Sequence, residues 1–215
     1  MMRTPLLLAA LGALTLSGGA VHARDLVGEY QLRAGPDAVG GLIVQPDGRF
    51  KYGLMAGSLD EGAEGRWERQ DDAVCLFTEP VPIAPAFIKV APREIDGAIP
   101  TVLVTWPNGR GIAGIDFTIR FDEGDPIEDY TQSDGWTMPP EDGRVPRTIA
   151  VHEPVHRITA LPFLLDTEDE GKLHVQLVPN DFGVPHFDGA CLKARGDIFV
   201  LQRSEGEMPF VRVGN

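Results

Sequence analysis

Residues 41–55, with the sequence GLIVQPDGRFKYGLM, decide the fold class. Two largely apolar runs, 41–45 and 49–55, flank the turn sequence Pro46-Asp47-Gly48. Proline, aspartate and glycine between two such runs are typical of the tight turn in a β-hairpin. The stretch therefore predicts two antiparallel strands, and the chain on either side repeats the same pattern.

Glycine and proline interrupt the chain throughout, with 25 and 18 copies among 215 residues. The longest run without either after residue 23 is 66–79, and its polar middle, 68–72, indicates two strands around a turn rather than a helix. We therefore expect almost no helix. Further strands are expected at 26–32, 65–69, 73–78, 86–90, 101–106, 115–121, 148–152, 173–178, 190–193, 197–202 and 209–213. Many short strands separated by turns predict an all-β sandwich or barrel.

The N-terminus has the pattern of a secretory signal peptide. Arg3 precedes the apolar run 6–16, and Val21 and Ala23 are small residues at the third and first positions before a cleavage site. We expect cleavage after Ala23, with an uncleaved anchor as the alternative. No later stretch has the roughly 18 consecutive apolar residues of a membrane span. The predicted location is the periplasm or the medium.

The charge balance excludes several kinds of partner. The chain carries 19 Lys and Arg against 32 Asp and Glu, a formal net charge of −13. Such a surface repels phosphate backbones and anionic lipid headgroups. We therefore expect neither nucleic acid nor an anionic membrane surface as a partner, and the sequence leaves the oligomeric state open.

The chain has two cysteines, Cys75 and Cys191. An even count in an oxidising compartment favours a disulfide, and the alternative is two buried thiols in separate strands. Each cysteine lies in a similar stretch, 65–77 or 189–201, in which a glycine opens a strand, a polar turn follows and an apolar strand closes. If the cysteines are bonded, the C-terminal strands must lie against the N-terminal ones and the middle of the chain is an insertion.

Two parts of the chain resemble known folds. Gly28-Glu29-Tyr30, the hairpin at 42–50, Gly65-Arg66-Trp67 and the apolar run 74–77 resemble the opening meander of lipocalin-like barrels. Residues 101–135, with the Pro107-Asn108-Gly109 turn and the sequence Thr131 to Gly135, resemble the carboxypeptidase-regulatory, transthyretin-like sandwich. The first resemblance implies an apolar cavity, and the second implies a binding module without an active site. The whole chain is similar to secreted bacterial β proteins.

These observations predict four regions. The signal peptide takes residues 1–23, a barrel-like β-meander takes 24–95, and an immunoglobulin-like or transthyretin-like sandwich takes 96–160. Residues 161–215 are expected to form C-terminal strands that pack back on the meander.

One sequence matches a catalytic motif. His152-Glu153-Pro154-Val155-His156 has the H-E-x-x-H spacing of zinc metalloproteases, which needs both histidines on one face of a helix. Pro154 opposes a helix, and in a strand the two histidines are about 13 Å apart, too far to share one zinc ion. A metal-dependent hydrolase using His152, Glu153 and His156 is therefore kept only as an alternative. A mononuclear site that adds His174 is a further one.

The acidic stretches 122–129 and 166–170 could offer oxygen ligands to calcium, although neither has the EF-hand spacing. Acidic loops also commonly serve solubility. We expect no metal and no cofactor.

Tyr130 and Trp136 flank the turn Ser133-Asp134-Gly135 and are the candidate binding residues. Exposed aromatic rings on a loop stack on sugars or prolines, whereas the alternative is that Trp136 folds back onto the sandwich. The sequence favours a secreted, non-catalytic β module that binds a protein or a small ligand in the cell envelope. The alternatives are the hydrolase and a purely structural envelope component.

Overall fold

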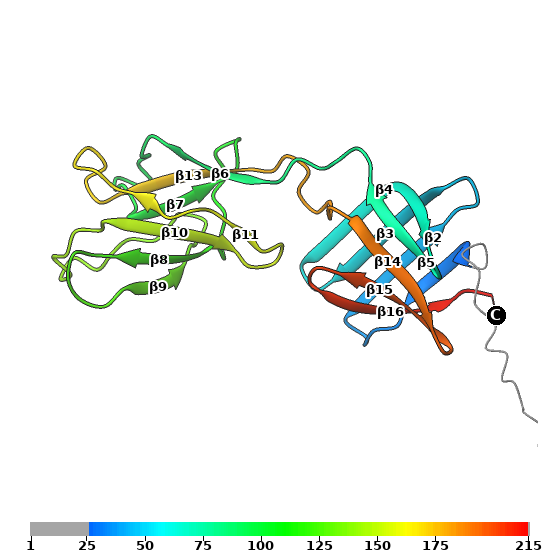
Figure 1. The fold of residues 1–215 in the computed structure, drawn as a ribbon. Coiled ribbons are helices and arrows are strands. Elements are labelled where there is room, and N and C mark those ends of the chain that lie inside the picture. The colour runs from blue at the N-terminus through cyan, green and yellow to red at the C-terminus, as the bar shows by residue number, and fades with distance from the viewer. Residues whose placement is uncertain (1–25, 215) are drawn as a thin grey trace, which may run out of the picture.

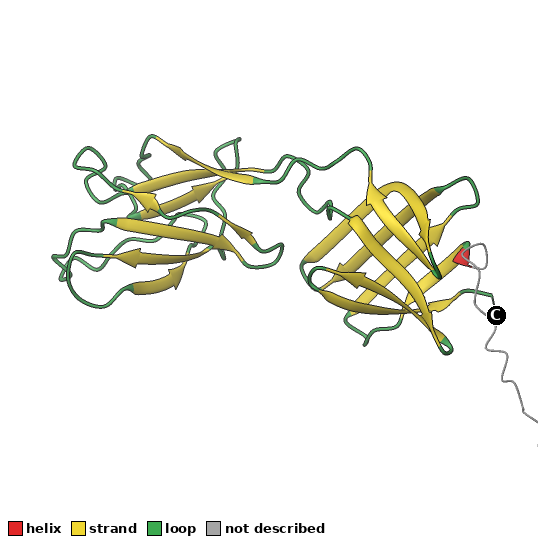
Figure 2. Cartoon of the chain, viewed as in Figure 1, coloured by secondary structure: helices red, strands yellow, loops and turns green. Residues whose placement is uncertain are grey.

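The computed structural model describes residues 26–214, and the predicted signal peptide lies outside the described residues. The described chain consists almost entirely of strands and turns, which confirms the all-β prediction (Figure 2). The strands form two bodies joined by two adjacent connecting segments (Figure 1).

The first body is a closed barrel in which every strand is antiparallel to its neighbours. Its order is β1-β16-β15-β14-β5-β4-β3-β2. The bounds are β1 Gly28–Leu32, β2 Ala38–Val44, β3 Arg49–Ala56, β4 Leu59–Gln70, β5 Ala73–Thr78, β14 Asp188–Arg195, β15 Ile198–Arg203 and β16 Gly206–Arg212. The barrel therefore combines five N-terminal strands with the last three strands of the chain.

The hairpin predicted at 41–55 forms β2 and β3. The amide of Gln45 donates to the carbonyl of Arg49 at 2.8 Å, and the Asp47 carboxylate accepts from the Arg49 amide at 3.0 Å. Gly48 has a φ of 88°, a left-handed conformation that glycine adopts without a steric penalty. This turn fixes the register in which Leu42 lies opposite Tyr52.

Alternate side chains of each barrel strand point inward and fill the interior, as expected for a small barrel. Along β3, for example, Phe50, Tyr52 and Leu54 are buried while Lys51 and Met55 are exposed. The other members of this barrel core include Leu26, Tyr30, Leu42, Val44, Val74, Leu76, Phe187, Leu192, Leu201 and Phe210.

The second body is a sandwich of two sheets formed by residues 86–178. One sheet has the order β6-β13-β7, and the other has β11-β10-β8-β9 with β12 also paired to β10. The bounds are β6 Ala86–Val90, β7 Val102–Thr105, β8 Asp116–Arg120, β9 Ile127–Tyr130, β10 Thr148–Glu153, β11 Ile158–Thr159, β12 Phe163–Leu164 and β13 Leu173–Val178. A separate apolar core lies between the sheets and includes Val104, Phe117, Ile149 and Val175.

The sandwich is larger than the predicted 96–160, so the predicted boundaries at 95 and 161 need correction. β6 lies before residue 96 and β13 lies after residue 160. The two strands pair with each other, with Ala86 opposite Val178 at one end and Val90 opposite His174 at the other. β13 also pairs in parallel with β7. Residues 161–178 therefore complete the sandwich, and only β14, β15 and β16 join the N-terminal meander to close the barrel.

The disulfide lies where the chain leaves and re-enters the barrel. Cys75 and Cys191 are bonded and are register partners on β5 and β14. Just beyond them, the amide of Thr78 donates to the carbonyl of Phe187 at 2.9 Å. Residues 79–187 are thus an insertion whose two ends lie side by side, and we call the connecting segments 79–85 and 179–187 the neck.

Candidate functional site

The end of the barrel that faces the sandwich is closed by a charged cluster. Arg203, at the end of β15, donates to the Glu61 carboxylate through both terminal nitrogens, at 2.7 and 3.2 Å. The same guanidinium lies 2.8 Å from the Tyr52 hydroxyl, which itself donates to Glu61 at 3.0 Å. The Arg203 and Glu61 side chains are only 9% and 14% exposed, so these charges are held inside the barrel mouth.

Burial raises the pKa of the Tyr52 hydroxyl well above its usual value, so the hydroxyl stays protonated as a donor. Burial by itself lowers the pKa of Arg203, but the hydrogen bonds to Glu61 and the nearby negative charges outweigh it and raise the pKa. A paired, buried guanidinium with all its partners in place is a structural element rather than a proton donor. The cluster therefore acts as a polar plug at this end of the barrel.

The H-E-x-x-H sequence forms a hairpin turn between β10 and β11, not a helix. The two oxygens of Glu153 accept hydrogen bonds from the amides of Val155 and His156, at 3.1 and 2.7 Å. The Nδ1 atom of His152 lies 2.8 Å from the Thr159 hydroxyl across the hairpin. Pro154 fits this turn. Inside a helix it would remove a backbone hydrogen bond, because proline has no amide hydrogen.

The tip of this hairpin reaches the neck. The His156 ring packs against Phe182 with 4.1 Å between ring centroids, and its Nδ1 atom lies 3.4 Å from Glu153 without a hydrogen bond among the described residues. His156 and Arg203 both line a crevice of about 390 Å³ between the two bodies. Within residues 26–214, no three His, Cys, Asp or Glu side chains gather closely enough to hold a metal ion.

The acidic stretches serve local structure. Asp169 pairs with Lys89 at 2.6 Å and accepts the amide of Asp166, and the pKa of Asp169 falls because these contacts outweigh its burial. Asp122 pairs with Arg147 at 2.6 Å.

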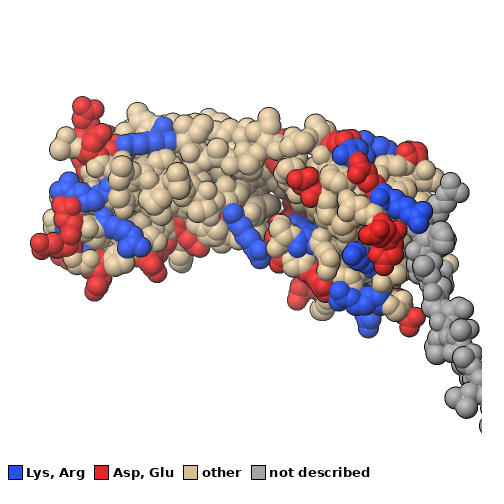
Figure 3. Space-filling view, viewed as in Figure 1, with Lys and Arg blue, Asp and Glu red and all other residues tan. Residues whose placement is uncertain are grey.

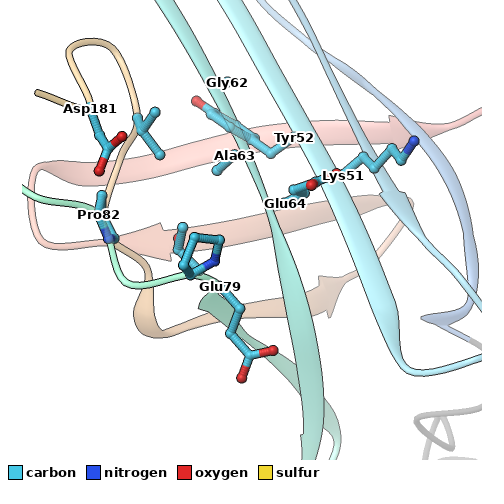
Figure 4. Close-up of a pocket in the computed structure, with 11 residues that line it drawn as sticks. Lys51, Tyr52, Gly62, Ala63, Glu64, Glu79, Pro82 and Asp181 are labelled. Atoms are coloured by element: carbon cyan, nitrogen blue, oxygen red, sulfur yellow. The ribbon is translucent and has the colours of Figure 1, made fainter.

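A larger hollow opens in the barrel wall beside the neck (Figure 4). β4 has 12 residues and β5 has only six, so the first half of β4 has no strand on that side. Two neck residues replace the missing strand: the Glu79 amide donates to the Glu64 carbonyl at 3.0 Å, and the Gly183 carbonyl accepts the Gly62 amide at 3.0 Å. Between them remains an opening of about 440 Å³, which we call the window.

The window has an apolar interior and a polar rim. It is lined by Lys51, Tyr52, Gly62, Ala63, Glu64, Thr78, Glu79, Pro80, Pro82, Asp181 and Val184. Figure 4 shows Asp181 and Pro82 entering from the neck, opposite Ala63 and Tyr52 of the barrel. The Glu79 carboxylate points away from the opening and is held by Arg49 and Arg66, at 3.0 and 2.7 Å.

Several polar groups at the window are already engaged. The Thr78 hydroxyl donates to the Pro185 carbonyl and accepts from the Phe187 amide, both at 2.9 Å. Asp181 accepts the Ile83 amide at 2.7 Å. The Thr78 bonds hold the second neck segment against β5, and the Asp181 bond joins the two neck segments to each other.

The predicted binding residues Tyr130 and Trp136 lie on the sandwich, far along the chain from the window. Trp136 packs on Phe117 with 5.1 Å between ring centroids, and its indole nitrogen donates to Asp129 at 2.9 Å. Tyr130 is 53% exposed on β9. The structure thus places Trp136 against the sandwich core and leaves the Tyr130 ring at the surface.

Sequence reasoning missed Tyr52, Glu61 and Arg203. A signal exists for two of them. Glu61 and Arg203 occupy inward-facing positions of strands whose neighbouring inward residues are apolar. A charged residue at such a position needs a partner. The identity of that partner depends on barrel closure, which pairs residues 142 positions apart.

Comparison of the chain with protein-family models, curated proteins and solved structures finds no match. The lipocalin-like and transthyretin-like resemblances stay predictions, and only the geometry of the site supports a function.

Proposed function

We propose that the protein is a secreted, non-catalytic binding module of the cell envelope and that the window is its binding site. The observation that supports this proposal is the opening of about 440 Å³ at the junction of the two bodies. Binding sites for small ligands measure about 300–1,000 Å³, are mostly apolar and often lie at domain junctions. Tyr52, Ala63, Pro80, Pro82 and Val184 supply the apolar lining, and Lys51 and Glu64 supply polar groups at its rim.

Binding rather than turnover is favoured by how the nearby charges are used. Arg203 is paired with Glu61, and Glu79 is paired with Arg49 and Arg66. Paired groups of this kind hold structure in place and are not themselves free for proton transfer. In the hydrolase alternative Glu153 is the base, but its two oxygens bind the amides of the hairpin turn.

The proposed location is supported by the signal-like N-terminal sequence and by the disulfide. A disulfide between Cys75 and Cys191 is compatible with an oxidising compartment. Within the described residues, no helix is long and apolar enough to cross a membrane. Charged side chains of both signs cover much of the barrel surface in the view of Figure 3.

The test is binding of the uncharged fluorescent dye N-phenyl-1-naphthylamine, together with native mass spectrometry of protein purified from its own compartment. Val184→Trp fills the window and is expected to lower dye affinity at least tenfold and to remove any co-purifying mass. Val211→Trp is the matched control, because Val211 is exposed on β16 and does not line the window. Equal dye binding by both variants contradicts the proposal.

A further inference from the structure

Three glycines form a row across the outer wall of the barrel. Gly41 on β2 is the register partner of Gly53 on β3, and Gly53 is the partner of Gly62 on β4. Successive residues of a strand point to opposite faces of the barrel wall, so the neighbours of each glycine point to the face opposite the glycine. Because Leu42, Tyr52, Leu54 and Ala63 point into the barrel core, the three glycines face outward.

Neither backbone conformation nor crowding requires glycine at these positions. None of the three has a left-handed φ. A Cβ added at Gly41, Gly53 or Gly62 stays 3.4, 3.9 and 4.0 Å from the nearest heavy atom, which is ordinary contact distance. Glycine within a regular strand weakens it, and one reason for its presence is a site where a ligand or another backbone approaches closely.

Side chains stand on both sides of the row. Ile43, Lys51 and Glu64 are register partners along one side, and Val39, Met55 and Asp60 lie along the other. Val39 and Met55 are 51% and 56% exposed. The row is therefore the floor of a shallow trough with partly apolar walls, and it ends at Gly62, where the window begins.

The trough and the window form one continuous surface. Three strands spaced about 4.8 Å apart give a floor of about 10 Å, which is the length of about three extended residues. Lys51, Gly62 and Glu64 belong to both the trough and the lining of the window. A chain lying on the glycine floor can thus place its next side chain in the window.

The charge at this surface is negative. Asp60, Glu64 and Asp181 carry carboxylates that form no ion pair among residues 26–214, and Lys51 is the cation beside them. The net charge of the whole chain is −13. Complementary charge steers association and selects partners.

We propose that the trough and window bind an extended basic peptide segment of a partner protein. Its backbone lies across Gly41, Gly53 and Gly62, an apolar side chain or proline enters the window, and Lys or Arg side chains meet Asp60 and Glu64. This inference rests on the proposed function, because it names the class of molecule that the window takes.

The experiment is selection of a random 12-residue phage-displayed library on the disulfide-intact protein, followed by fluorescence anisotropy with the selected peptides. We expect sequences with Lys or Arg around an apolar residue. Gly62→Leu covers the floor and is expected to weaken binding at least tenfold. Gly143→Leu is the matched control, because a Cβ there meets nothing within 4 Å, so the site has room for the side chain, and Gly143 lies in the sandwich.

Charge reversal provides a second variant that leaves the barrel wall intact. Asp60→Lys and Glu64→Lys change exposed side chains and are together expected to abolish binding of basic peptides, with circular dichroism and urea unfolding confirming the fold. Peptides without a basic bias, or equal binding to the Gly62→Leu variant, overturn the inference. If the dye binds at the window but no peptide is enriched, this inference fails and the proposed function stands. If neither binds, both fail.

Discussion

Cys75 and Cys191 lie directly opposite each other on β5 and β14 and are joined by a disulfide, although 116 positions separate them in the chain. The bond crosses the seam between the N-terminal meander and the C-terminal strands. All of the sandwich lies within the loop that it closes. The disulfide therefore holds the barrel together at the point where the insertion interrupts it.

Removing this disulfide is expected to destabilise the protein strongly. In the chain-entropy account, a cross-link that closes a loop of about 100 residues stabilises the folded state by at most about 5 kcal/mol. The variant Cys75→Ala/Cys191→Ala should lose several kcal/mol of unfolding free energy in urea, with far-UV circular dichroism as the readout. Wild-type protein kept in reductant is the control and should behave alike. A loss below about 1 kcal/mol in both contradicts the expectation.

The Glu61–Arg203 pair is expected to show strong coupling. Removing one partner of a buried ion pair leaves an uncompensated charge and costs about 3–5 kcal/mol, whereas replacing both by apolar residues is often nearly neutral. Glu61→Leu and Arg203→Met should each lower the unfolding free energy by that amount, and the double variant should recover most of it. A double-mutant cycle from urea unfolding measures the coupling. Additive losses from the two substitutions argue against a shared plug.

Stability is expected to fall at mildly acidic pH because of His174. The ring lies in the sandwich between the Thr105 hydroxyl and the Ala91 carbonyl, at 3.0 and 2.9 Å. Burial lowers its pKa, assisted by nearby Arg93 and opposed by the bond to Ala91. In the unfolded chain His174 therefore takes up a proton near pH 6.5, the usual pKa of histidine, and in the folded chain it does so only at lower pH. Stability is lost as the pH falls below about 6.5.

Urea midpoints measured at pH 7.5 and pH 5 check this expectation. His174→Gln should reduce the difference between the two midpoints. His186→Gln is the matched control, because His186 is exposed in the neck and should leave the difference unchanged. An unchanged difference in the His174→Gln variant assigns the pH dependence to other groups.

The sequence predicts the local elements of this fold well. The Pro46-Asp47-Gly48 turn and the alternation around it indicate β2 and β3, because turn chemistry and side-chain period are local properties. The even number of cysteines and the predicted oxidising compartment favour a bond between Cys75 and Cys191, and the structure contains it. The return of the C-terminal strands to the barrel follows from that pairing.

The site depends on relationships that are not local. The sequence predicts that β6 belongs to the N-terminal region, but its pairing with β13 places it in the sandwich. The window forms because β5 ends opposite Gly65 while β4 continues, a difference in strand length that the sequence pattern does not show. The alignment of Gly41, Gly53 and Gly62 likewise appears only once the register of three strands is known.

Trp136 and Tyr130 are expected to differ in their effects on stability. Trp136 packs on Phe117 and bonds to Asp129, so Trp136→Ala should lower the unfolding free energy by about 2 kcal/mol, less than a fully buried tryptophan. Tyr130→Ala changes an exposed side chain and should stay within about 0.5 kcal/mol. Urea unfolding of both variants gives the comparison. A binding defect in the Tyr130→Ala variant without loss of stability supports the prediction that this ring contacts a partner.

The barrel is expected to fold without the sandwich. The eight barrel strands share one core, and no residue of that core belongs to the core of the sandwich. The amide of Thr78 and the carbonyl of Phe187 are already hydrogen-bonded at 2.9 Å, so β5 and β14 can be joined as a hairpin. Replacing residues 79–186 with the two-residue turn Asn-Gly should give a soluble β protein.

Two readouts decide whether this shortened chain is the same barrel. Mass spectrometry before and after reduction should show an intact bond between Cys75 and Cys191, because the register of β5 and β14 is preserved. Binding of N-phenyl-1-naphthylamine should be lost, because Pro80, Pro82 and Val184 of the window are removed. An aggregated chain with free thiols means that the sandwich is needed for barrel closure. A folded chain that still binds the dye places the apolar site elsewhere on the barrel.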